Sequence, residues 1–146
     1  MAQTYFGSTV RAGSGTLTDT VDGGFMVLAQ TTTATTVGAG TAVSSTITLP
    51  AESQIIDLIV DMVTVPSFGT ATLVNATIGT AAAGTQYLSA TDVTLVGRTA
   101  LAFTAAQLTS MSNIGANQSV VFTIDPDGTV ASQGTFRLTV VYAQKV

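Results

Sequence analysis

Few side chains in this sequence are able to carry out chemistry. Its 146 residues contain no His and no Cys, and only 8% are charged. Without an imidazole, the usual general base near neutral pH is missing, which excludes Ser–His and Cys–His nucleophile arrangements. Zinc and copper sites built on imidazole or thiolate are excluded for the same reason. Carboxylates are the main candidates that remain.

Asp57 and Asp61 lie four residues apart in a segment of alternating apolar residues. A glycosidase needs two carboxyl groups about 5–9.5 Å apart. Four residues along an extended strand separate the two side chains by roughly 13 Å. We therefore interpret both as solvated or interface residues on a half-exposed strand.

Asp125 and Asp127, followed by Gly128, are a second acidic pair. They could contribute to a calcium loop, but Pro126 stands between them and no later Glu completes the usual spacing. The order of residues favours a turn over a cation site. No phosphate-binding glycine motif is present either. We expect no cofactor, no metal and no small-molecule substrate, and we predict that the protein is not an enzyme.

The charged residues are few and unevenly distributed between the two signs. The net charge is −4, and the only cations are Arg11, Arg98, Arg137 and Lys145. Four scattered cations form no patch for nucleic acid or for an anionic membrane, so neither is an expected partner. Arg98 and Arg137 are candidates to pair with acidic residues across an interface. A charge content of 8%, against about 25% in an average domain, favours a chain that is covered by other protein in an assembly.

Residues 1–24 lack sustained periodicity and are predicted to form an extended N-terminal arm. Tyr5 and Phe6 are two large aromatic residues in an otherwise small and polar stretch, and aromatic residues are enriched at interface hot spots. Together with Arg11 they are the predicted contacts to other subunits or to a capsid. The alternative is that the two aromatic side chains fold back on their own domain.

Residues 25–146 carry the pattern of a β-sandwich domain. Strand-like runs cover 25–36, 45–49, 54–65, 70–80, 87–95, 118–124 and 135–142. In 54–65 the alternation places four apolar residues on a core face, namely Ile56, Leu58, Val60 and Met62. The other face carries Asp57 and Asp61, which is typical of an antiparallel sheet with one wet side.

One short helix interrupts this pattern. Thr104 and Gln107 have the spacing of a capping box, which predicts a helix over 105–111. The last two strands, joined through the turn sequence 125–128, are predicted to form a hairpin. The expected fold is all-β: an antiparallel β-sandwich of about eight strands, with a jelly roll as one form of it.

Four stretches carry a resemblance: ITLPAESQIIDLIVD at 47–61, ATLVNATIGT at 71–80, YLSATDV at 87–93 and GTFRLTVVY at 134–142. They resemble the small β-sandwich structural proteins of tailed bacteriophage virions, which decorate or cement capsids or form head and tail appendages. The resemblance covers about residues 25–143. It implies a homo-oligomer, often a trimer, seated where major capsid protein subunits meet, and it implies no catalytic residue.

The sequence thus predicts a virion structural protein, and within that class a capsid decoration or cement protein that stabilises the head by bridging capsid subunits. Its partners would be itself and the major capsid protein. The start of the chain shows no secretion signal, which favours synthesis in the host cytoplasm and a place in the virion over a pilus or surface-layer subunit. The alternative is a phage fibre, tail or adhesin module that binds host glycans. The candidate residues for that alternative are Asn75, Tyr87, Asn113 and Asn117.

Overall fold

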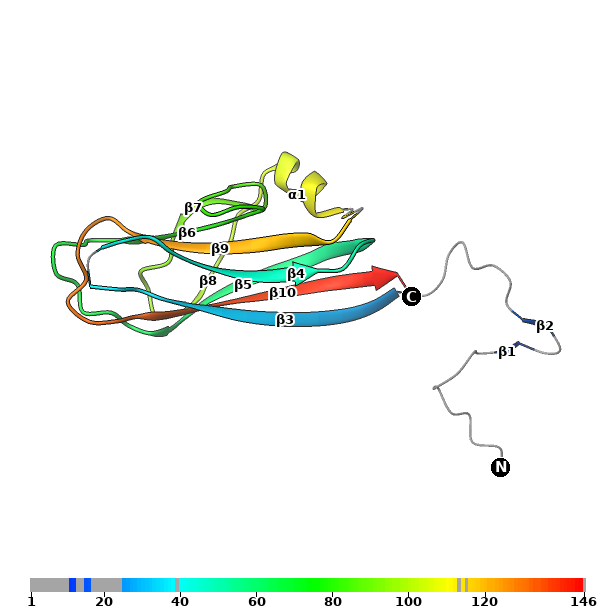
Figure 1. The fold of residues 1–146 in the computed structure, drawn as a ribbon, viewed down its shortest axis with the longest axis horizontal. Coiled ribbons are helices and arrows are strands. Elements are labelled where there is room, and N and C mark those ends of the chain that lie inside the picture. Colours follow the sequence, from blue (N-terminus) through cyan, green and yellow to red (C-terminus); the bar gives the residue numbers. More distant parts are fainter. Residues whose placement is uncertain are drawn as a thin grey trace, which may run out of the picture.

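The computed structural model describes residues 11–12, 15–16, 25–38, 40–112, 114 and 116–145. Two short strands, β1 (Arg11–Ala12) and β2 (Gly15–Thr16), pair with each other. The remaining strands form two antiparallel sheets of four strands each, accompanied by one helix (Figure 1). None of the helical structure in the described ranges is long and apolar enough to span a bilayer.

The elements of the two sheets follow in chain order. They are β3 (Phe25–Thr35), β4 (Val43–Leu49), β5 (Ser53–Thr64), β6 (Val74–Gly79), β7 (Leu88–Asp92), β8 (Gly97–Thr99), α1 (Ala105–Ser112), β9 (Gln118–Pro126) and β10 (Thr135–Lys145). One sheet has the strand order β3-β10-β5-β8, and the other has the order β4-β9-β6-β7.

The pairing of these strands is nested. The first strand of the sandwich pairs with the last, β3 with β10, and successive inner pairs are β4 with β9, β5 with β8, and β6 with β7. A long hairpin folded over on itself gives this order, and the result is the jelly-roll arrangement of two packed sheets. The predicted antiparallel β-sandwich is confirmed, in its jelly-roll form.

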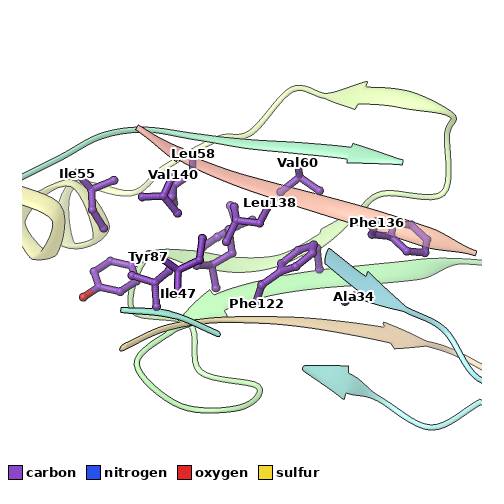
Figure 2. Close-up of a cluster of buried hydrophobic side chains, with 14 of the residues drawn as sticks. Ala34, Ile47, Ile55, Leu58, Val60, Tyr87, Phe122, Phe136, Leu138 and Val140 are labelled. Carbon is purple, nitrogen blue, oxygen red and sulfur yellow. The ribbon is translucent and has the colours of Figure 1, made fainter. Parts of the chain in front are cut away.

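The core lies between the two sheets and is filled by alternate residues of each strand. Figure 2 shows Phe136, Leu138 and Val140 of β10 pointing across the gap towards Phe122 of β9 and Ile47 of β4. All five side chains are buried. Each large apolar side chain removed from water contributes about 1.5–3 kcal/mol, so this stripe is a principal source of stability. The strand predicted over 135–142 is confirmed, and its alternate residues form this buried stripe.

Strand β5 departs from the predicted alternation near its start. Ile55 and Asp57 pair with consecutive residues of β10, so Ile56 has no partner and forms a bulge. The bulge reverses the side-chain direction. Ile55 turns into the core and Ile56 turns outward, where it is 52% exposed. The prediction that Ile56 belongs to the core face is therefore wrong. The other predicted members of that face are buried, namely Leu58, Val60 and Met62.

Strands β9 and β10 do not form the predicted hairpin, because they belong to different sheets. The chain leaves β9 through the predicted turn and then crosses the end of the sandwich. The carbonyl of Thr129 accepts hydrogen bonds from the amides of Gly69 and Ala71, each at 3.0 Å. These bonds hold the segment after β9 against the connection between β5 and β6. The segment therefore leads from one sheet to the other and does not close a hairpin.

Candidate functional site

The predicted arm contacts lie almost wholly outside the described residues. Tyr5 and Phe6 belong to the part of the chain that the structure does not describe, and Arg11 is placed in β1 by its backbone alone. Their role as subunit or capsid contacts therefore stays a prediction. The division into an arm over 1–24 and a domain over 25–146 is a prediction in the same sense.

Asp61 and two arginines form a cluster on the outer face of the β3-β10-β5-β8 sheet. Asp61 is on β5, and in the sheet it pairs with Arg137 of β10 on one side and with Arg98 of β8 on the other. Its Oδ2 accepts a hydrogen bond from Nη2 of Arg137 at 3.0 Å, and its Oδ1 accepts one from Nε of Arg98 at 3.3 Å. The expectation that these arginines pair with acidic residues across an interface is thus corrected, because both bind Asp61 of their own chain.

Asp61 is less solvated than expected. Its side chain is 13% exposed, whereas the side chains of Arg98 and Arg137 are 65% and 46% exposed. Burial raises the pKa of Asp61, but the hydrogen bonds and positive charges of the two arginines outweigh it and hold the pKa below its ordinary value of 3.8. Since arginine hydrogen bonds occupy both carboxylate oxygens, the cluster joins three neighbouring strands and leaves no free carboxylate for acid–base chemistry.

Of the acidic pair at the end of β9, Asp127 holds a neighbouring loop in place. The Oδ1 of Asp127 accepts hydrogen bonds from the amides of Thr72 at 2.7 Å and Leu73 at 3.1 Å, and its Oδ2 accepts one from the Thr72 hydroxyl at 2.6 Å. These bonds lower the pKa of Asp127. Asp125 pairs with Asn75 in the sheet. The carboxylate of Asp127 therefore fixes the start of β6, and among the described residues no three His, Cys, Asp or Glu side chains gather in a way that would hold a metal ion.

A pocket of about 290 Å³ lies beside α1. It is lined by Thr80, Gln86, Tyr87, Ser110, Ile114, Ala116 and Gln118. Tyr87 is almost fully buried, and that burial raises the pKa of its phenol. Gln86 uses its Oε1 to accept a hydrogen bond from the Thr80 amide at 3.1 Å. The lining offers neutral hydroxyl and amide groups and no charged residue, which suits a neutral polar ligand more than an ion.

Only one of the residues predicted for glycan binding lines this pocket. Tyr87 does, while Asn75 lies on β6 between Asp92 and Asp125 of the neighbouring strands. The Oδ1 of Asn117 accepts a hydrogen bond from the Ala51 amide at 2.9 Å. Asn113 lies outside the described residues. The glutamines of the pocket, Gln86 in a loop and Gln118 at the start of β9, were missed, because an isolated Gln carries no sequence signal of its own.

Comparison with known proteins adds no relative to these observations. No family model, curated protein or solved structure matches the chain. A function for it therefore depends on its residues and their arrangement.

A further candidate site is the side of the sandwich where β3 and β4 lie close together as outer strands of the two sheets. We call the outer edges of these two strands the open flank. No residue from Gly23 to Ala51 is charged, and the stretch is free of proline until Pro50. The register of β3 with β10 and that of β4 with β9 run without a bulge. No described strand pairs with the outer edge of either one.

The opposite side of the sandwich is protected in several ways. Strand β8 has only three residues and carries Arg98, while β7 carries Asp92 and has an irregular register with β6. Short length, charge and bulges are the usual devices that keep an edge strand from pairing with another chain. The open flank has none of them.

The helix adds to this protection. Its predicted capping box is confirmed, since the Thr104 amide donates to Oε1 of Gln107 at 2.8 Å and the Gln107 amide donates to the Thr104 hydroxyl at 3.3 Å. The Nε2 of the same glutamine donates to the Thr85 carbonyl at 3.2 Å and to the Ser89 hydroxyl at 3.0 Å. These bonds fasten α1 beside the edge strand β7.

Proposed function

We propose that the protein is a structural subunit that acts by making protein–protein contacts, with the open flank as a principal contact surface. The observation that carries this proposal is the contrast between the two sides of the sandwich. One side combines short strands, charges, a bulge and a helix, and the other presents two uncharged edges with an unbroken register. An edge of that kind is a ready template for another strand and is rarely left unprotected in a free monomer.

The fold and the sequence resemblance indicate which class of structural protein we propose. Jelly rolls occur in viral capsid proteins and in lectins, although a fold by itself does not decide a function. The resemblance to small virion proteins of tailed phages favours the first of these classes. We therefore propose a capsid decoration or cement protein of the virion, homo-oligomeric, with the major capsid protein as its partner and a trimer as the form that the resemblance implies.

The mechanism of such a protein is mechanical. A rigid sandwich that contacts several capsid subunits at once ties them together, since each later contact forms at the high effective concentration that the first one creates. Few charges have to be desolvated on the open flank. An N-terminal arm carrying Tyr5, Phe6 and Arg11 would extend the contact to a neighbouring subunit.

The mass of the full chain in solution tests the proposal first. We expect light scattering on the purified protein to give a defined oligomer instead of the 14.7 kDa monomer. A full-length variant with Tyr5→Ala and Phe6→Ala tests the arm, and it should weaken binding to phage capsid shells in a sedimentation assay. An Asp57→Asn variant, changed on the outer face of the sandwich, is the matched control for nonspecific effects. A monomer that does not sediment with shells would contradict the proposal.

One observation favours a second function, the binding of host glycans. The pocket beside α1 has an aromatic side chain, Tyr87, among neutral hydrogen-bonding groups and no charge. That chemistry suits a sugar hydroxyl. We would screen the purified protein on a glycan array and repeat any positive result with Tyr87→Phe, which removes only the phenol oxygen. Binding that Tyr87→Phe abolishes would favour the glycan module over the capsid protein.

A further inference from the structure

We infer that the outer edge of β3 pairs with the same edge of a second copy, antiparallel and about a two-fold axis, so that two four-stranded sheets become one continuous sheet of eight strands. This inference rests on the proposed function for its premise that copies of the chain associate. It goes further by naming the strand, the partner and the symmetry, and the two-fold pair takes the place of the trimer that the resemblance implies.

Strand length selects β3 itself as the partner of β3. It has 11 residues, whereas the other described outer strands have seven (β4), five (β7) and three (β8). Pairing with any of those would leave much of the β3 edge without backbone partners. Pairing with another β3 offers the whole edge a partner of equal length, and backbone N–H and C=O groups are obligatory hydrogen-bonding groups.

The absence of charge points to the same arrangement. Around a two-fold axis each residue faces itself or a residue of the same strand, so a charge in β3 would meet a like charge nearby, which destabilises a strand pair. None of the eleven residues is charged. Because the β3–β10 register is unbroken, no bulge twists the edge away from a partner.

The side chains of β3 allow a close approach. Its outer-face residues alternate with those that face the core, and four of them are exposed in the single chain: Val27, Ala29, Thr31 and Thr33. They are small or β-branched, and such residues pack well across paired strands. On the core side, Gln30 near the middle of the strand donates a hydrogen bond to the Tyr142 hydroxyl at 2.8 Å, which keeps it inside its own sandwich. With the axis near Gln30, Ala29 of one copy would face Thr31 of the other.

The first test uses charge. In the full chain, Thr31→Lys places two ammonium groups close to each other across the proposed axis. We expect analytical ultracentrifugation to show a dimer, or an even multiple of it, for the unchanged chain and an at least tenfold weaker association for Thr31→Lys. Thr139→Lys is the matched control, because Thr139 pairs with Thr31 on the same outer face but lies one strand inside the edge. It should associate as the unchanged chain does, and circular dichroism should show that both variants keep the fold.

The second test probes the distance between equivalent residues of the two copies. It does not require a variant that weakens their association. The chain has no cysteine, so a single cysteine can be placed at each of these four exposed positions of β3. Equivalent residues of two antiparallel strands separate by about 6.6 Å for each residue of distance from the axis. A short bis-maleimide should therefore cross-link Ala29→Cys and Thr31→Cys efficiently, and Val27→Cys and Thr33→Cys poorly.

The outcomes separate this inference from the function that it rests on. A monomeric unchanged chain would overturn the β3 pairing, and a monomer that also fails to sediment with capsid shells would overturn both. A trimer, or an oligomer that Thr31→Lys leaves intact, would overturn the β3 pairing and leave the structural-subunit proposal in place. Equal cross-linking at all four cysteines would also contradict a fixed two-fold axis. Loss of the oligomer in the variant with Tyr5→Ala and Phe6→Ala, but not in Thr31→Lys, would assign self-association to the arm.

Discussion

Among single residues, Asp61 has the most defined electrostatic role, because it joins β5 to β8 through Arg98 and to β10 through Arg137. Ion pairs with exposed partners contribute little each, so we expect Asp61→Asn to lower the free energy of unfolding by about 1 kcal/mol at neutral pH. Urea unfolding followed by circular dichroism measures this change. Asp57→Asn is the control on the same face of the same strand, and its effect should stay within about 0.5 kcal/mol.

The effect of Asp61 should depend on pH in a definite direction. Its pKa in the folded chain is lowered from 3.8, so the unfolded chain takes up a proton more readily than the folded one. The stabilisation is therefore present above pH 3.8 and disappears as the pH falls through the lower, folded pKa. Stability curves of the unchanged chain and of Asp61→Asn should converge as the pH falls below 3.8 and through the lower pKa of the folded chain. Curves that stay parallel would show that the variant acts through packing and not through charge.

At the scale of elements, the end of β3 is tied to the start of β10 by one buried threonine. The Thr36 amide donates to the Gly134 carbonyl at 2.9 Å, and the Gly134 amide donates to the Thr36 hydroxyl at 2.8 Å. Thr36→Val keeps the shape but leaves that amide without a partner, which should cost about 1–3 kcal/mol of unfolding free energy. Thr36→Ser keeps the hydroxyl and should cost less in the same denaturation experiment. An equal loss in both would show that the methyl group matters more than the hydrogen bond.

The elements also show what a sequence can and cannot predict. The capping box of Thr104 and Gln107 and the buried stripe ending at Tyr142 were predictable, because each depends on residues close together in the chain. The bulge at Ile56 was not, because it depends on the strand that pairs with β5. The missing hairpin has a similar cause, since either sheet offers β10 a place to pair.

The candidate sites follow the same division. The lack of charge over 23–51 can be read from the sequence, but the position of β3 and β4 at the edges of the sheets is a property of the topology. Asp61, Arg98 and Arg137 were each noted as charged residues. Their meeting on one face requires three strands to lie side by side, and no local pattern reveals it.

In the whole molecule, the two strands whose edges form the open flank carry no charged residue. This has a measurable consequence for the association of the chain. Contacts made by backbone hydrogen bonds and small uncharged side chains release few ions, so salt should hardly affect them. We expect the dissociation constant of the oligomer to change less than about tenfold between roughly 0.05 M and 1 M sodium chloride. Sedimentation across a salt series measures this. A steep loss of association with salt would instead indicate contacts that depend on charged residues such as Arg11.

The nested pairing of the strands also bears on how the chain is made. Phe25 pairs with Lys145, so the outermost pair of the jelly roll joins residues from opposite ends of the domain. Folds dominated by such distant contacts fold slowly, typically in milliseconds to seconds. During synthesis on the ribosome, β3 and β5 have to wait for β10, the last strand to emerge, before their sheet can close. Until then both present unpaired edges, and a nascent chain of this topology is most exposed to wrong association shortly before its last strand is released.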